Sequence, residues 1–449
     1  MTIGLFIAGT GLDAMQTAMD TVAQNLSNAS TPGYVSESAA LVANPDTNAL
    51  GVGGGVSVAA ITQANSPLLT ANVVQTQGAL SQATSLQQVL NGAQAVFPEP
   101  SSSGLAQQLS NFWQTWDSLA QSPSSPAPYN EVVDVAQNLV SSLHSASGQL
   151  TNLQNNSQTQ LSSTVTQANT LLAQVASLNG QITATAGNGA SPNSLIDQQN
   201  QVIQNLAQLV GVTVTPGPGG TANVEIGGID LVQGTIAQTL AVQGAPGSET
   251  LATASGGATV PTSGGVAAGL LAAINQYLPS YQNQLDGVAN ALASTVNGQL
   301  AAGYTTTGQP GSASPLFTGS GAAGLSVNPS VVANPESIAA SSTATLPAAS
   351  NNGGNAQAMA QLFNSPTGPD QTYQSLIEVL GSQVQSVNNQ VHSQTSVANA
   401  AQQQLQAATG VNPDTQMVTL LNLQQTYQAA AKVIQTIDTA LQSLLNTVP

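Results

Sequence analysis

The last stretch of the chain carries the pattern that most restricts how the chain can fold. Apolar residues recur there at alternating steps of three and four, which places them on one stripe of a helix with the spacing of a coiled-coil seam. They are Leu420, Leu423, Tyr427, Ala430, Ile434, Ile437, Leu441 and Leu444. A helix with such a stripe needs a partner to cover it.

The first residues of the chain carry a matching stripe. Its members keep the same step and are Leu5, Ala8, Leu12, Met15, Met19, Val22 and Leu26. We therefore expect the N- and C-terminal helices to pair as a coiled coil. Burying about seven apolar side chains gains on the order of 10 kcal/mol, but ordering about two dozen residues costs at least as much. The pair is predicted to be marginal alone and stable when copies pack side by side, so both stripes are candidate self-assembly surfaces.

Charged side chains are scarce in this chain of 449 residues. Lysine and arginine together number 1, aspartate and glutamate 18, and charged residues make up 4%, whereas ordinary domains carry about 25%. A net charge of −17 with Lys432 as the sole cation excludes nucleic acid and argues against an anionic membrane surface as a partner. A chain with one cation would also avoid positive self-repulsion in strongly acidic surroundings, where carboxylates are protonated.

The chain shows no signal for insertion into a membrane or for processing. It contains no cysteine, which excludes disulfides and thiolate metal sites and fits an exported protein. Residues 1–8 are apolar but lack a basic start, and no small-residue cleavage pattern follows them, so we expect no cleaved signal peptide. No run reaches the ~18 apolar residues of a membrane span.

Helical periodicity dominates the chain between the two stripes. It extends through 68–96, 105–120, 131–186, 193–210, 266–300 and 356–408. Between 211 and 264 short alternating segments are separated by glycine and proline, which predicts a small β domain. The expected fold is mainly α: an elongated helical-bundle rod with a small inserted β domain and paired terminal helices.

This pattern predicts a division of the chain into successive segments. The segments are an N-terminal axial helix (1–34), the first part of a helical rod domain (35–210), the small β domain (211–264), a helical return to the rod (265–305), a Gly/Ser/Ala-rich irregular segment (306–354), the last part of the rod (355–410) and a C-terminal axial helix (411–449).

The sequence offers no positive sign of catalysis, of a cofactor or of a metal site. The two histidines, His144 and His392, each lie in a helical run, and no nucleophile, HExxH or paired-acid pattern accompanies them. The acidic residues are scattered singly, and no calcium-binding loop emerges. We expect both histidines to be solvent-facing or satisfied by a hydrogen bond, and we expect no enzyme activity.

A turn signal follows the first predicted helix, in the sequence NLSNASTPGY at 25–34. The matching positions of a signature N-x-S/A-N-x-x-T-P-G-Y/F are Asn25, Asn28, Thr31, Pro32, Gly33 and Tyr34. With this signature the chain resembles the flagellar rod, hook and hook-associated proteins, which carry it after their first helix.

Further stretches narrow the resemblance to the hook-associated protein 1 (FlgK-type) family. SPNSLID at 191–197 with VGV at 210–212, ANPESIAA at 333–340, and GVNPDTQM at 410–417 with QTYQAAAKVI at 425–434 are similar to segments of that family in the same order. The chain departs from the family by having Val35-Ser36 after the turn and Thr415-Gln416 near its end, where the family carries Arg and Glu-Glu. Ion pairs made by those charges cannot be carried over.

The resemblance implies a structural adaptor that joins the flagellar hook to the filament and assembles as a ring through its terminal helices. The implied partners are further copies of the chain, the hook subunit, a second junction protein on the filament side, and an export chaperone that binds the C-terminal stripe. It also implies type III export without a cleaved signal peptide, to an extracellular location on the flagellum.

Three other classes of protein fit parts of the sequence. A hook or distal-rod subunit would share the turn signature, but its middle is expected to be rich in β-structure, whereas 68–210 is mostly helical here. A secreted coiled-coil adhesin would explain the polar uncharged surface but not the matched stripes. A hydrolase fused to this family would need a catalytic constellation in 211–350, and the sequence shows none.

Overall fold

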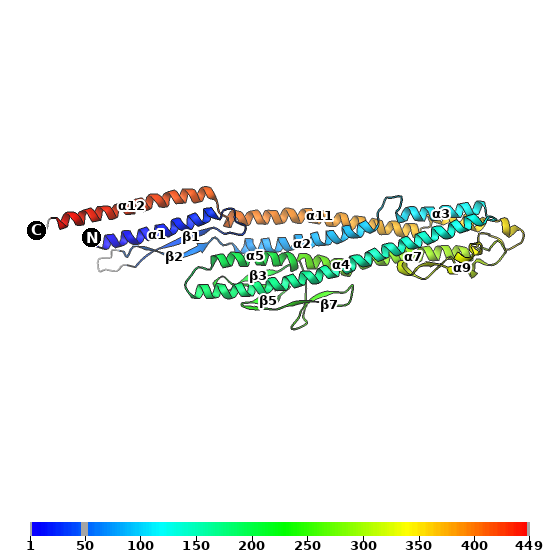
Figure 1. The fold of residues 1–449 in the computed structure, drawn as a ribbon, viewed down its shortest axis with the longest axis horizontal. Helices are drawn as coiled ribbons and strands as arrows, with labels where there is room; N and C mark the ends of the chain where they lie inside the picture. Colours follow the sequence, from blue (N-terminus) through cyan, green and yellow to red (C-terminus); the bar gives the residue numbers. More distant parts are fainter. Residues whose placement is uncertain (1, 46–52, 447–449) are drawn as a thin grey trace.

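The computed structural model describes residues 2–45 and 53–446. The remaining parts of the expected segments 1–34, 35–210 and 411–449, namely residues 1, 46–52 and 447–449, lie outside the described residues. The molecule is elongated, and both ends of the chain lie at the same end of its long axis (Figure 1). This arrangement matches the mainly helical rod expected from the sequence.

The terminal part of the molecule consists of two helices and a hairpin. Helix α1 (Thr2–Ser27) and helix α12 (Pro413–Leu445) lie side by side. Strands β1 (Glu37–Ala43) and β2 (Val56–Gln63) pair antiparallel and pack against α1. Residues 35–45 and 53–63, which the sequence analysis assigned to the helical rod, therefore lie with α1, because the turn after α1 folds this strand pair back onto it.

The body is a bundle of long helices. These are α2 (Pro67–Val96), α3 (Leu105–Gln121), α4 (Pro126–Gly187), α5 (Asn193–Val210), α6 (Gly265–Ala272), α7 (Leu278–Ala301) and α11 (Pro369–Thr409). Helix α4 runs unbroken for 62 residues, about 93 Å. A π-helical turn, η2 (Ala273–Tyr277), interrupts the run predicted over 266–300 and divides it into α6 and α7.

Two small antiparallel sheets lie on α4. One has the order β3 (Thr213–Pro216), β4 (Ala222–Ile226), β5 (Ile229–Gln233), β6 (Ile236–Ala237), and the other has the order β7 (Leu240–Gln243), β8 (Thr250–Thr253), β9 (Thr259–Val260). Asn179 anchors the first sheet: its side chain donates to the carbonyls of Ala222 and Gly234 and accepts from the Ala222 N–H. Asn169 does the same for Leu240 in the second sheet.

The far end of the molecule is built from short elements. They are η3 (Gly311–Ala313), β10 (Phe317–Thr318), α8 (Gly321–Gly324), β11 (Ser326–Val327), α9 (Pro329–Ala333), η4 (Pro335–Ser337), η5 (Ala348–Asn351), α10 (Gly354–Ala360) and η6 (Gln361–Asn364). One further short helix, η1 (Pro218–Gly220), lies in the β region between β3 and β4. The run predicted over 356–408 breaks before Pro369, because Pro366 and Gly368 form a turn there.

One continuous hydrophobic core joins the body helices, the sheets and these short elements. Phe112, Trp113 and Trp116 of α3 lie in it, with the ring of Phe112 edge-on to both tryptophans. No residue of α12 is buried among those that the structure describes, and α12 contributes nothing to this core. The body is thus complete without the C-terminal helix.

Candidate assembly surface

Helices α1 and α12 run antiparallel in a fixed register. A Cβ placed on Gly4 would lie 3.3 Å from Cδ1 of Ile437, and the Asn25 side chain donates to Oε1 of Gln416 at 3.1 Å. Both helices advance 21 residues between these two contacts. They therefore stay in step along most of their length.

The C-terminal stripe lies along the contact with α1. Its members Leu420, Leu423, Tyr427, Ala430, Ile434, Ile437 and Leu441 are half-buried, as are Gln416 and Ala431, whereas Leu444 is 50% exposed. The register places the six members from Ile437 back to Leu420 opposite Gly4, Ile7, Gly11, Ala14, Ala18 and Thr21 in turn, of which Ala14, Ala18 and Thr21 are buried. Large side chains of α12 thus cover a line of mostly small residues on α1.

This contact corrects the pairing expected for the N-terminal stripe. The face of α1 toward α12 lies one residue earlier than that stripe, because small residues let the larger side chains of α12 approach closely. Within the stripe, Ala8 and Val22 are buried, Leu12, Met15, Met19 and Leu26 are half-buried, and Leu5 is 40% exposed. Helix α1 has a second neighbour, the hairpin, against which the Thr10 hydroxyl accepts from the N–H of Val56 at 3.4 Å. The role of the stripe in self-assembly stays a prediction.

Asn25 of the turn signature joins α1, the hairpin and α12. Its side-chain nitrogen donates to the Glu37 carbonyl at 2.7 Å and to Gln416. Its oxygen accepts from the Glu37 N–H and from the Tyr34 hydroxyl, both at 2.9 Å. The side chain is fully buried, so this position needs a residue that both donates and accepts.

The other signature residues shape the turn itself. Asn28 donates to the Gln24 carbonyl and accepts from the Thr31 hydroxyl. Pro32 is exposed, and Gly33 has a φ of 81°, a conformation that glycine adopts at no steric cost. The turn sends the chain back along α1, where the Ser36 N–H donates to the carbonyl of Thr409 at the end of α11.

A polar joint connects the hairpin to the start of α5. The Asn193 side chain donates to Oε1 of Glu37 at 2.9 Å, and the Gln63 side chain donates to Oδ1 of Asp197 at 3.0 Å. Burial is the main cause that raises the pKa of Asp197 to about 6, and the nearby Glu37 carboxylate acts in the same direction. Hydrogen bonds from Gln63 and Val35 act in the opposite direction. A cleft of about 960 Å³ lies beside this joint, between the turn, the hairpin, α5 and the end of α11.

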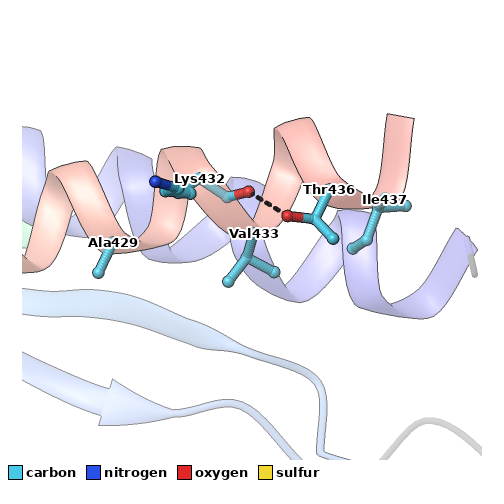
Figure 2. Close-up of a pocket in the computed structure, with 5 residues that line it drawn as sticks. All are labelled: Ala429, Lys432, Val433, Thr436 and Ile437. Carbon is cyan, nitrogen blue, oxygen red and sulfur yellow. Dashed lines mark hydrogen bonds between the residues drawn. The ribbon is translucent and has the colours of Figure 1, made fainter. Parts of the chain in front are cut away.

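The side of α12 turned away from α1 carries exposed apolar side chains. Met417, Val418, Leu421 and Val433 are each about half exposed. Lys432 lies beside Val433 at a shallow hollow that Ala429, Thr436 and Ile437 also line, with α1 running behind it (Figure 2). Exposed apolar side chains on a helix with one covered face are typical of an interaction surface.

The structure brings no catalytic or metal-binding constellation to this surface. His144 and His392 are exposed and lie on different helices, and His144 bonds to the Leu325 carbonyl. Across residues 2–45 and 53–446 no group of three or more His, Asp or Glu side chains could hold a metal ion. Nor is any helix in those residues long and apolar enough to cross a membrane.

The polar joint was not found from the sequence. Glu37, Gln63, Asn193 and Asp197 meet only because distant segments fold together. The segment 191–197 stands out in the sequence as a family-like motif, but nothing in it indicates contact with the hairpin. The face of α1 that contacts α12 did carry a signal: Gly4, Gly11, Ala14 and Ala18 recur at helical spacing. This second stripe is less conspicuous in the sequence, because larger apolar residues lie one position after each of its members.

Comparison with known proteins agrees with these features. Residues 90–317, half of the chain, match the model of the flagellar hook-associated protein FlgK helical domain. The chain belongs to the FlgK family of flagellar structural proteins. Residues 5–34 match the flagella basal body rod protein family, and residues 402–447 match the C-terminal family of flagellar basal body rod FlgEFG proteins. The resemblance drawn from the turn signature and the later segments is confirmed.

Individual relatives span the chain to different extents. Flagellar hook-associated protein 1 of Salmonella typhimurium is 30% identical over 318 residues, which cover 68% of this chain but little more than half, 57%, of that protein. The Bacillus subtilis protein of the same name is 26% identical over 99% of this chain and 98% of its own length. The structure of the flagellar hook junction protein FlgK from Burkholderia pseudomallei aligns with a TM-score of 0.63 at 20% identity, over 76% of this chain and all of that one, and shows a shared fold.

Proposed function

We propose that this protein is a structural adaptor of the bacterial flagellum that joins the hook to the filament. Its segments 1–34 and 411–449 form an axial part that assembles as a ring of copies, and the helical body and β domain form the part between and around them. It has no enzyme activity. Its partners are further copies of itself, the hook subunit, a second junction protein on the filament side and an export chaperone that binds the C-terminal stripe.

One observation carries the proposal: in the described part of the chain α12 packs mainly against α1 and keeps large apolar side chains exposed to solvent. No residue of α12 in the described part of the chain is buried, and Met417, Val418 and Leu421 are each about half exposed. A 33-residue helix held on one face gains little over the entropy lost in ordering it. Packing of neighbouring copies would bury the remaining face and supply the missing stabilisation.

The family and the absence of cysteine support an extracellular location. A member of the FlgK family works on the flagellum, and we propose that this chain reaches its extracellular site by type III export without a cleaved signal peptide. The helical body is the feature that favours the junction over the hook or the distal rod, since the match to the FlgK helical domain covers 90–317.

Deletion of residues 414–449 tests the proposal. The truncated chain should keep its body folded, because α12 contributes nothing to the main core, but it should fail to form assemblies and fail to bind the export chaperone. Circular dichroism with thermal unfolding would report the body, and sedimentation velocity over a concentration series would report assembly. Full assembly by the truncated chain would overturn the proposal.

A matched point variant separates loss of the surface from loss of the helix. Met417→Gln/Leu421→Gln should weaken assembly while the helical content of the chain is retained, because glutamine is as good a helix former as methionine or leucine. Thr419→Gln/Gln425→Ala alters α12 at exposed polar positions and should leave assembly close to wild type. Equal effects of the two double variants would argue against an apolar contact at this face.

A further inference from the structure

Lys432, the single basic residue of the chain, is exposed on α12. The sequence has 18 acidic residues, yet no carboxylate in the described residues lies within salt-bridge distance of the Lys432 ammonium group. At 100° per residue its position on α12 lies roughly half a turn from the stripe that contacts α1. Its charge is therefore presented to whatever approaches the outer side of α12.

The outer side of α1 presents the opposite charge. Asp13 and Asp20 are exposed and lie two helical turns apart on one line, on the side of α1 that faces away from α12. Within residues 2–45 and 53–446 neither carboxylate accepts a hydrogen bond. The other acids that the structure describes in the terminal part are engaged. Glu37 accepts from Asn193, Asp438 accepts from Gln442, and Asp414 lies in the first turn of α12, where the helix dipole favours it.

These charges therefore lie on opposite sides of the helix pair. A positive outer face and a negative outer face on one unit cannot satisfy each other within a single copy. They are complementary between neighbours placed side by side in the same orientation. Such a contact is head-to-tail, and its repetition closes into a ring when the rotation between copies allows it.

The register of the pair selects the acidic partner. Because Gly4 lies against Ile437 and Asn25 against Gln416, Lys432 is level with Gly9 of its own chain. Asp13 is four residues farther along, an axial offset of about 6 Å, whereas Asp20 is eleven residues farther, about 16 Å. A lysine side chain spans the first offset with little relative shift of the two copies, but not the second.

We propose that the outer face of α12 in one copy docks against the outer face of α1 in the next copy, with Lys432 paired to Asp13 of that copy. This inference rests on the self-assembly included in the proposed function. The hollow beside Lys432 and the half-exposed Val433 supply apolar contact around the pair. Exclusion of water by that contact strengthens the attraction between the two charges.

Zero-length cross-linking of the full chain tests the contact directly. A carbodiimide joins an amine to a carboxylate, and Lys432 carries the only side-chain amine in the sequence. Equal amounts of ¹⁵N-labelled and unlabelled protein, concentrated until assemblies sediment, should yield cross-linked peptides of mixed isotope that join Lys432 to Asp13. Asp13→Asn should abolish this product, and the matched variant Asp20→Asn should retain it.

Assembly itself gives an independent readout. Lys432→Gln should raise the concentration needed for assembly about threefold to tenfold, the effect of losing one partly shielded ion pair. Lys432→Arg keeps the charge, so it should assemble like wild type while giving no amide cross-link. Both side chains are exposed, so circular dichroism of the variants should match that of the wild type.

The possible outcomes separate this inference from the proposed function. Assemblies that lack the Lys432–Asp13 product, or that join Lys432 to another acid, would overturn the pairing and leave the adaptor role intact. The same holds if Lys432→Gln assembles at the wild-type concentration. If the full chain forms no assembly at any concentration, the self-assembly in the proposed function fails, and this inference fails with it.

Discussion

Asn25 is the side chain through which the first helix, the hairpin and the last helix meet. Its amide group makes four hydrogen bonds, two donated and two accepted, and it is fully buried. An aspartate could not donate to Glu37 and Gln416, and a leucine would leave the Tyr34 hydroxyl and the Glu37 N–H without partners. The geometry of this one amide thus accounts for the first position of the turn signature.

Replacement of this residue should detach the terminal part without unfolding the body. We expect Asn25→Ala to weaken the packing of α1, the hairpin and α12 by about 2–4 kcal/mol, since buried donors and acceptors lose their partners. Hydrogen exchange should accelerate in α1 and β1, while the thermal transition of the body stays in place. Asn28→Ala is the matched control, because its bonds are local and exposed; a similar effect of both variants would contradict a special role for Asn25.

Asp197 gives the polar joint a defined response to pH. Its pKa in the folded chain is raised to about 6 by burial, above the ~3.9 of an aspartate in an unfolded chain. The folded state therefore holds the proton more tightly, so the contribution of this carboxyl to stability is present in full below about pH 4. It is lost as the pH rises to about 6 and beyond.

Asp197→Asn should remove this pH dependence. The variant is expected to be more stable than the wild type at pH 7 by about 1–2 kcal/mol, after allowance for solvent screening of a half-buried group, and equal to it near pH 4. Urea unfolding at pH 4, 5, 6 and 7 would measure the difference. If the stability gap does not widen with pH, burial of the carboxylate is not what controls the joint.

At the scale of elements, glycine decides how closely helices approach. A Cβ on Gly269 of α6 would lie 2.4 Å from the carbonyl oxygen of Gln82 in α2, a distance that real Cβ atoms do not reach. A Cβ on Gly148, in the middle of α4, would meet nothing within 4 Å. The same change at these two positions should therefore have opposite consequences.

We expect Gly269→Ala to destabilise the body by about 1–3 kcal/mol, because α2 and α6 must move apart. Gly148→Ala should stabilise it by about 0.5–1 kcal/mol, because alanine loses less backbone entropy in a helix. Urea unfolding of both variants against the wild type measures the two effects. Two changes of the same sign would refute the close approach of α2 and α6.

Elements with strong periodicity were predicted well from the sequence. The structure has helices over the predicted runs 68–96, 105–120 and 193–210, and the predicted fold class is confirmed. The failures have physical causes. Helix α1 has two neighbours, so its most hydrophobic stripe is not the face toward α12. Strands as short as β6 and β9 carry too few residues to show alternation.

The candidate surface was predictable only on one of its sides. The sequence indicates the face of α12 that contacts α1, because the large stripe residues from Leu420 to Leu441 lie toward this one partner. The joint of Glu37 with Asn193, and of Gln63 with Asp197, links residues separated by more than 130 positions. Polar contacts at such separation depend on the completed fold, and a local pattern cannot reveal them.

At the scale of the whole molecule, the scarcity of cations governs the response to acid. Near pH 3 most of the 18 carboxyl groups are protonated, and only Lys432, the two histidines and the N-terminus remain positive. The acid-induced repulsion that unfolds ordinary proteins is therefore small here. We expect the thermal midpoint of the body to change little between pH 7 and pH 3, as measured by circular dichroism. A steep fall over that interval would contradict this account, and added salt should have little effect at pH 3.

The unbroken helix α4 also has a mechanical consequence. It contacts both sheets and the helices on either side of it, so a load applied at the far end of the body travels along one rigid strut without crossing a loop. Bending is expected in the segments around Ala64 and Gly410, where the chain passes between the terminal part and the body. Such a molecule would bend between its terminal part and its body while α4 stays straight. A tube built from the terminal helices could then flex while the bodies keep their shape.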